Sequence, residues 1–263
     1  MNEQQAKPSK RLRLLGIPID SIDPDFLNEL LIDLLHSDGN HQIIFLRTLD
    51  LLRARRNPEF LACLENASLV VPVSKGLQIA CEQLHLGRLP RYSPFDFMIK
   101  LLNVLEAKHA SFYLLGDVQP YLNRTETNLR HTFPGAQPLG RYTGTFSRTV
   151  EQNIRIAISK ASPNLLLAGP GLKGKSLWIY RRRSSFPRGV QVWCAECFHY
   201  FTARKKRPNR VSFRKGRDYY RESIGKPWRW FRFPLYAFFQ FLVLVERVRH
   251  PRPSSANYGT TKF

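Results

Sequence analysis

No hydrophobic run in the sequence is long enough to cross a lipid bilayer. A spanning helix needs about 20 apolar residues, and the apolar stretch near the C-terminus, PLYAFFQFLVLV at residues 234–245, is shorter than that. The first residues, MNEQQAKPSKRLR, lack the hydrophobic segment and the cleavage site of a secretory signal. We therefore expect a cytoplasmic protein without a membrane-spanning helix.

Cysteine is also scarce, and the spacing of the four cysteines gives no disulfide framework. Cys63 and Cys81 have no close partner in sequence, whereas Cys194 and Cys197 form a single C-x-x-C pair. One such pair is a weak metal or redox signal, even with His199 nearby. The apolar neighbours of the pair predict a strand with buried thiols. We expect neither a metal nor a cofactor.

Acidic residues are few, above all in the last third of the chain. The sequence has 41 Lys and Arg against 20 Asp and Glu, a formal net charge of +21. From Arg181 to the end, twenty basic residues stand against four acidic ones, so +16 of this charge lies there. Between residues 204 and 233 the cations alternate with aromatic rings, as in RKKRPNR and FRKGRDYYRESIGKPWRWFRF.

This tail suits an anionic partner, and two classes of partner compete. Arginine alternating with Trp and Tyr fits an anionic membrane surface, and it also fits nucleic acid, where phosphates take the charge and bases stack on rings. A third interpretation is a solvated basic face on a core helix. The apolar run at residues 234–245 favours the membrane, because a nucleic-acid surface has no use for it. We expect a peripheral position on the inner face of the cell membrane and no nucleic acid.

Strands and helices alternate along the first two hundred residues. Apolar runs predict strands that include residues 11–19, 42–46, 68–71, 111–115 and 164–168. Helices are predicted between them, one of them continuous from Leu49 to Leu64. The strands show no period-two alternation, which is typical of a parallel sheet covered on both faces.

We therefore expect an α/β fold: a Rossmann-like, mostly parallel sheet with helices on both faces, followed by a basic helical C-terminal appendage. The predicted division is a loose lead-in at residues 1–10, an α/β domain at 11–203 and the appendage at 204–263. Ligands of such sheets bind at the carboxyl ends of the strands. The loops VSKG, LGD and GPGLKGKS would gather there.

Seven segments carry a resemblance that covers nearly the whole chain. They are LLGIPID, ARRNPEFLACLENASLVVPVSKG, LPRYSPFDFM, FYLLGD, FPGAQPLGRYTGTF, SPNLLLAGPG and GRDYYRESIGKPWRWFRF. In this order they resemble the WecG/TagA/CpsF family of bacterial glycosyltransferases, glycosyltransferase family 26. The resemblance implies transfer of a hexosamine-type sugar from a UDP donor to a polyprenyl-diphosphate-linked acceptor in cell-envelope polysaccharide synthesis. It also implies a membrane-docking tail that helps to complete the active site, and self-association stays open.

The sequence departs from the family pattern where the chemistry is expected. The family aspartate of P-D-G, its general base, is Val73 here. A donor-binding T-L-N at a strand end is replaced by residues 45–47, which end in Arg47. The P-K-Q-E loop becomes residues 173–176, and the aspartate of F-D-F becomes His199. Valine cannot take a proton, so a catalytic protein needs another base, for which His199 and Asp96 are the weak candidates.

The candidates for substrate binding lie in loops after predicted strands. They are Ser74, Lys75, Gly76, Arg91, Ser93, Gly171, Gly174, Lys175 and Ser176. Tail arginines are candidates for a diphosphate or for lipid headgroups. These are Arg214, Arg217, Arg221, Arg229 and Arg232. For Arg91, a surface ion pair is as good an interpretation as substrate binding. For His199, which lies beside aromatic residues, a core position is a commoner role than that of a base.

Residues 169–176, GPGLKGKS, also satisfy G-x-x-x-x-G-K-[ST] after a predicted strand. A P-loop nucleotide-binding protein is therefore an alternative, although Pro170 is unusual in such a loop and no apolar strand ending in aspartate follows it. Two further alternatives are a catalytically inactive paralogue, which binds a nucleotide-sugar, a lipid diphosphate or a partner enzyme, and a nucleic-acid binder that uses the basic tail.

Overall fold

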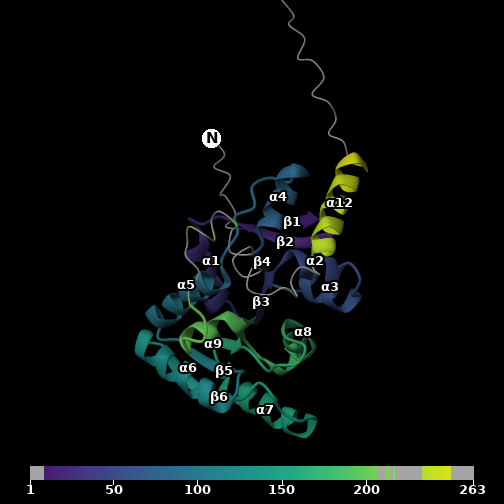
Figure 1. Cartoon of the computed structure of the whole chain (residues 1–263). Coiled ribbons are helices and arrows are strands. Elements are labelled where there is room, and N and C mark those ends of the chain that lie inside the picture. Colours follow the sequence, from purple (N-terminus) through teal and green to yellow (C-terminus); the bar gives the residue numbers. More distant parts are fainter. Residues whose placement is uncertain (1–8, 207–210, 212, 214–215, 217–232, 250–263) are drawn as a thin grey trace, which may run out of the picture.

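The computed structural model describes residues 9–206, 211, 213, 216 and 233–249 (Figure 1). Its centre is a six-stranded sheet in the order β4-β3-β8-β7-β5-β6. Each neighbouring pair of these strands is parallel. The strands are β3 (Asn40–Leu46), β4 (Leu69–Pro72), β5 (Ser111–Leu115), β6 (Gln137–Tyr142), β7 (Leu165–Ala168) and β8 (Gly189–Trp193). The predicted parallel α/β sheet is confirmed.

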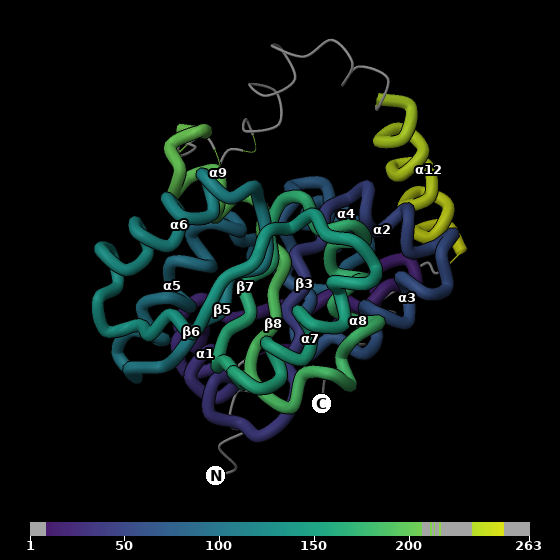
Figure 2. Tube along the Cα trace, turned by 90° about the horizontal axis from the view of Figure 1, so that it is seen from below, coloured from purple at the N-terminus to yellow at the C-terminus, as the bar shows by residue number. Residues whose placement is uncertain are grey.

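Helices cover both faces of this sheet, as Figure 2 shows. One face carries α1 (Leu27–His36), α5 (Pro94–Ala107), α6 (Gln119–Thr132) and α9 (Ala195–Phe201). The other carries α2 (Thr48–Ala54), α3 (Pro58–Glu65), α7 (Arg148–Ala161) and α8 (Ser176–Arg181). Successive strand residues enter different cores: Ile43 packs with the first group of helices and Ile44 with the second. Both faces of the strands are therefore apolar, as the sequence pattern predicts.

The first predicted strand is wrong in one respect. Residues 11–19 do not form a single strand, because β1 (Ser9–Leu14) and β2 (Ile17–Ile22) pair antiparallel in a separate two-stranded sheet. Leu15 and Gly16 form the turn, with φ of 51° and 82°. Two consecutive residues with positive φ are the requirement of a tight type I′ hairpin turn. The expected lead-in lies largely outside the described residues, and its last two residues belong to β1.

The helix predicted from Leu49 to Leu64 is also wrong, because it is two helices. α2 ends at Ala54 and α3 begins at Pro58. Asn57 is the N-cap of α3, and its side-chain oxygen accepts a hydrogen bond of 2.9 Å from the amide of Phe60. Proline at the first position of a helix cannot continue an earlier one, so the Asn-Pro pair divides the segment.

The C-terminal helix, α12 (Phe233–Arg249), lies beside α2 and α4 (Lys75–Gln83) in Figure 1. Phe239 and Val243 are buried in the core that these helices share. Other positions along α12 expose large apolar side chains. They are Phe233, Leu235, Phe238, Phe241, Leu244 and Val248. Within the described ranges, no helix has the length and hydropathy that a membrane crossing requires.

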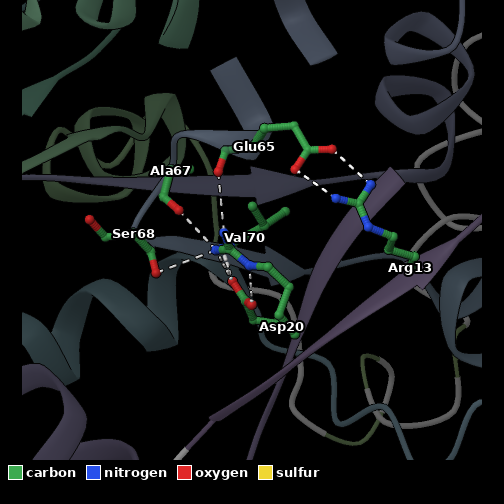
Figure 3. Close-up of polar contacts among 7 residues, drawn as sticks. Arg13, Asp20, Glu65, Ala67, Ser68 and Val70 are labelled. Carbon is green, nitrogen blue, oxygen red and sulfur yellow. Dashed lines mark hydrogen bonds and ion pairs between the residues drawn. The ribbon is translucent and has the colours of Figure 1, made fainter. Parts of the chain in front are cut away.

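The hairpin is joined to β4 by one buried carboxylate, which Figure 3 shows. Asp20 is only 3% exposed. Its two oxygens accept hydrogen bonds from Arg11 at 2.8 and 2.9 Å, and Oδ2 also accepts one from the amide of Val70 at 2.6 Å. Arg11 donates further to the carbonyl of Ala67 at 2.8 Å. The free edge of β4, the strand that precedes the predicted VSKG loop, is thereby paired with a side chain.

We expect Asp20→Asn to lower the free energy of unfolding by about 2 kcal/mol. Asparagine lacks the charge and one of the acceptor oxygens. Breaking a fully buried ion pair costs roughly 3–5 kcal/mol, and the cost is smaller here because the Arg11 side chain is 37% exposed. Chemical denaturation measures this. The matched control is Glu65→Gln at the exposed pair with Arg13, for which we expect under about 1 kcal/mol. Equal losses in the two variants would contradict the account.

Candidate active site

The carboxyl ends of β3, β8 and β7 lie side by side in the middle of the sheet. Arg47 directly follows β3, and Glu196 lies three residues beyond the end of β8. The loop that follows β7 ends at Lys175, before α8. Because neighbouring parallel strands end at the same edge, the three charged residues are brought to one region.

Arg47 and Glu196 form an ion pair across the ends of β3 and β8, in which Nη2 donates to Oε1. The amide of Arg47 also donates to the carboxylate of Asp50 at 3.2 Å. Burial lowers the pKa of Arg47, but Glu196 and Asp50 outweigh it, so the pKa lies above its ordinary value. Burial raises the pKa of Asp50, and the charges of Arg47 and Lys175 oppose that rise. The four charges therefore influence one another at this edge.

Lys175 has a backbone conformation that is rare for a residue with a side chain, with φ of 55° and ψ of −127°. Its ammonium lies 5.1 Å from the centroid of the Trp193 ring. Trp193 in turn donates from Nε1 to the carbonyl of Gly169 at 2.9 Å. The side chain of Lys175 is exposed and makes no ion pair with the described residues. A strained backbone in the loop at this edge of the sheet is typical of a functional position.

The first part of the glycine-rich loop is packed against the backbone of Gly144, whereas Gly171 and residues 173–175 are exposed. A Cβ at Gly144 would lie 2.1 Å from the carbonyl oxygen of Pro170, so the two backbones touch. Gly171 and Gly174 have φ of 83° and 87°, which the turns of the loop require. The amide of Lys175 donates to the carbonyl of Leu172, and Ser176 begins α8. In a phosphate loop these amides would face the ligand, so this geometry gives the P-loop alternative little support.

The second candidate loop follows β4 and ends at Ser74, the N-cap of α4, so that Lys75 and Gly76 lie in the first turn of that helix. Ser74 Oγ accepts from the amide of Thr48 at 3.3 Å, and a Cβ at Gly76 would lie 2.9 Å from Thr48 Oγ1. Lys75 Nζ donates to Gln78 Oε1 at 3.1 Å. This loop is therefore held against the start of α2, beside the strand that delivers Arg47.

Arg91 and Ser93 belong to the same side of the site. Arg91 Nη1 donates to the carbonyl of Val73 at 3.3 Å, and Ser93 is buried at the start of α5. The guanidinium lies 4.1 Å from the centroid of the Phe213 ring. A Cβ at Gly216 would lie 3.1 Å from Lys75 Cγ. Phe213 and Gly216, two described residues of the predicted appendage, therefore lie against Arg91 and Lys75.

The five tail arginines proposed for a diphosphate or for lipid lie outside the described residues. They are Arg214, Arg217, Arg221, Arg229 and Arg232. Their roles stay predictions.

The two candidate loops share one edge of the sheet but are not adjacent. β4 and β7 are separated by β3 and β8, so three strand spacings, about 14 Å, lie between the strands that deliver them. The Arg47–Glu196 pair lies between the loops. Sequence reasoning missed Glu196 because it fell inside the C-x-x-C pair, and it treated Arg47 only as a departure from the family pattern. The position of Arg47 directly after a strand was the available signal.

The two weak candidates for a general base occupy different helices. Asp96 lies in the first turn of α5 and is half-buried. His199 lies on α9, one turn beyond Glu196, and is also half-buried. Burial lowers the pKa of His199, and Arg204 and Lys205 lower it further. The imidazole is therefore largely neutral near pH 7 and able to accept a proton.

The proton-accepting position that the resemblance assigns is filled by an apolar side chain. Val73 is buried, and its amide donates to the carbonyl of Leu46 at 3.0 Å. It directly follows β4 at the same edge as the other candidates. No proton transfer can use this side chain.

All four thiols are buried, as expected from the sequence. Cys194 and Cys197 place their sulfur atoms 3.5 Å apart, but Cys197 lies in α9 and not in the predicted strand. Burial raises the pKa of Cys63 to about 12 and that of Cys81 to about 11. It also raises the pKa of Cys197 well above its ordinary value. Cys63, Cys81 and Cys197 therefore stay protonated and behave as small apolar side chains.

We expect Lys175→Gly to be more stable than Lys175→Ala by about 0.5–1 kcal/mol. Both variants lack the ammonium group. Glycine adopts the positive φ of this position without steric cost, whereas alanine keeps the backbone strain. Thermal unfolding of the two variants measures the difference, and the charge lost is the same in both. A more stable alanine variant would show that residue 175 has an ordinary backbone conformation.

Comparisons with known proteins agree with this geometry. The sequence model of the Glycosyl transferase WecG/TagA/CpsF family matches residues 12–254. A protein of Bacillus spizizenii, named N-acetylglucosaminyldiphosphoundecaprenol N-acetyl-beta-D-mannosaminyltransferase, is 23% identical over 179 residues, which are 68% of this chain and 69% of that protein. The family match covers most of the sheet, both candidate loops and α12. The chain therefore belongs to the WecG/TagA/CpsF family of glycosyltransferases.

Proposed function

We propose that this protein is a membrane-peripheral glycosyltransferase. It transfers a hexosamine-type sugar from a UDP donor to a polyprenyl-diphosphate-linked acceptor in cell-envelope polysaccharide synthesis. The observation that carries the proposal is the family match over residues 12–254. The name of the Bacillus relative, which gives a diphosphoundecaprenol-linked sugar as acceptor, supports the choice of acceptor class.

The charges at the strand ends support a diphosphate-containing donor. Glycosyl transfer from such a donor releases a nucleoside diphosphate, whose charge has to be stabilised. Lys75 begins α4, Arg91 precedes α5 and Lys175 precedes α8, and Arg47 follows β3 between the strands that lead to Lys75 and Lys175. Because about 14 Å separate the strands of the two loops, a ligand in contact with both is extended, as a nucleotide-sugar is.

Binding and turnover together test this proposal. We expect UDP-N-acetylmannosamine to bind in calorimetry and its sugar to be transferred to undecaprenyl-diphosphate-N-acetylglucosamine. Lys175→Ala should weaken donor binding roughly 10-fold, the effect of one lost charge-assisted hydrogen bond. The matched control is Lys160→Ala in the last turn of α7, which precedes β7 and so lies at the opposite edge of the sheet.

Two other outcomes separate the alternatives. Donor binding without turnover would support the inactive paralogue, which the apolar Val73 favours. Binding of ATP that is lost in Lys175→Ala, with no binding of the UDP-sugar, would support the P-loop protein. A protein that binds neither the UDP-sugar nor ATP would contradict the proposed function.

Membrane association rests on two features of the C-terminal part. Its charge suits anionic headgroups, each basic residue contributing about 1 kcal/mol near the surface. The outward side of α12 exposes Phe241 at 59%, Leu244 at 51% and Val248 at 78%. The inward side is occupied by the core contacts of Phe239 and Val243. An amphipathic arrangement of this kind suits a helix that lies in the membrane interface.

We expect the protein to bind vesicles that contain anionic phospholipid, and Phe241→Glu with Leu244→Glu to weaken that binding at least roughly 10-fold. Two exposed apolar side chains lose their burial in lipid, while the core under α12 is unchanged. Vesicle co-sedimentation measures the effect. Ile156→Glu on α7, a residue 45% exposed, is the control. Deletion of residues 204–263 should abolish binding, and persistence of binding would contradict the role of the tail.

A further inference from the structure

Sugar transfer to a hydroxyl needs a proton acceptor, and Val73 does not supply one. We propose that Glu196 is the catalytic base, that it takes the proton of the acceptor hydroxyl, and that Arg47 is its positioning residue. This inference rests on the proposed function. It adds a residue that the family pattern did not suggest.

Three carboxylates follow the central strands at the carboxyl edge, and their partners distinguish them. Asp117, which follows β5, is 6% exposed and is held by Arg204 and by its neighbour's amide. Asp50 accepts from the amide of Arg47 in the capping box that begins α2. Both carboxylates are used by the fold. Glu196 alone follows the central strand β8, between the two candidate loops.

The geometry of Glu196 leaves one of its oxygens available to a substrate. Oε1 accepts from Arg47 Nη2, which fixes the direction of the carboxylate. Among the residues that the structure describes, Oε2 receives only the thiol of Cys194, at 3.8 Å, and a thiol is a weak donor. The side chain is 21% exposed, so it is accessible from the edge of the sheet and largely shielded from bulk water. A base needs this combination of orientation and access.

Titratable groups of the neighbouring elements act on Glu196 itself or on its partner Arg47 and the adjacent Asp50. Arg47 and Asp50 come from the end of β3 and the start of α2. His199 and Cys197 come from α9, and the charge of Glu196 acts on both. Lys175 approaches from the loop after β7 and acts on Asp50. Arg47 and Lys175 follow β3 and β7, the two strands that flank β8, so cations are delivered on both sides of the strand that precedes Glu196, where a departing diphosphate would need them.

The proposed step balances in atoms and charge. The acceptor oxygen forms a bond to the anomeric carbon of the sugar, and the bond from that carbon to the diphosphate oxygen breaks. The electron pair of the broken bond leaves with the UDP, next to the cations. The proton of the acceptor hydroxyl moves to Glu196 Oε2 and is later released to water.

Glu196→Gln tests this assignment in the full-length protein. Glutamine keeps the shape and can still accept from Arg47, but it is not a base. We expect kcat/KM to fall at least roughly 100-fold, with donor affinity within about twofold of wild type. In the wild-type protein, protonation of the base should lower kcat/KM toward low pH. The remaining activity of Glu196→Gln should lack this fall. Glu196→Asp, which keeps a carboxylate, should retain more activity than Glu196→Gln.

The control and the other variants make the test decisive. Glu126→Gln, at the pair with Arg141 between α6 and the outermost strand β6, should leave activity unchanged. Calorimetric donor binding by Glu196→Gln confirms that the site is folded. If Glu196→Gln stays active, or if the pH profile changes only in His199→Asn, Glu196 is not the base, while the proposed function stands. A wild-type protein that binds no donor and transfers no sugar would overturn both.

Discussion

The candidate site depends on one constraint, the parallel alignment of β3, β8 and β7. Parallel neighbours end at the same edge of the sheet. The strand order alone therefore brings Arg47, Lys175 and Glu196 to one region. The ion pair between Arg47 and Glu196 links two of these strand ends. Asp20 fixes the hairpin at the outer edge of β4, from which the other candidate loop leaves.

Most of the architecture could be predicted because it follows from local pattern. Apolar runs without alternation indicate a parallel sheet with two covered faces, and Ile43 and Ile44 do pack into different cores. Two boundaries were wrong for local reasons: the Leu15-Gly16 turn needs positive φ at both residues, and Asn57 caps a new helix. Both signals were short and were outweighed by longer apolar patterns.

The site could be predicted only in part. Loops at strand ends follow from the fold, so Lys75 and Lys175 could be placed at the edge in advance. The pairing of Arg47 with Glu196 could not, because 149 residues separate them and it depends on the strand order, which places β8 beside β3. The resemblance assigns the catalytic carboxylate to position 73, which is a valine here. The strand order brings a second carboxylate, Glu196, to the same edge of the sheet.

A crystal structure of the protein with UDP would test the central claim, that a single site spans the carboxyl ends of β4, β3, β8 and β7. We expect the diphosphate to lie within hydrogen-bond distance of Arg47 or Lys175, and residues 72–76 and 169–176 both to contact the ligand. The Oε2 atom of Glu196 should face the space beside the β-phosphate, where the sugar and the acceptor hydroxyl would lie. A UDP molecule bound away from this edge, or in contact with one loop and neither cation, would contradict the account.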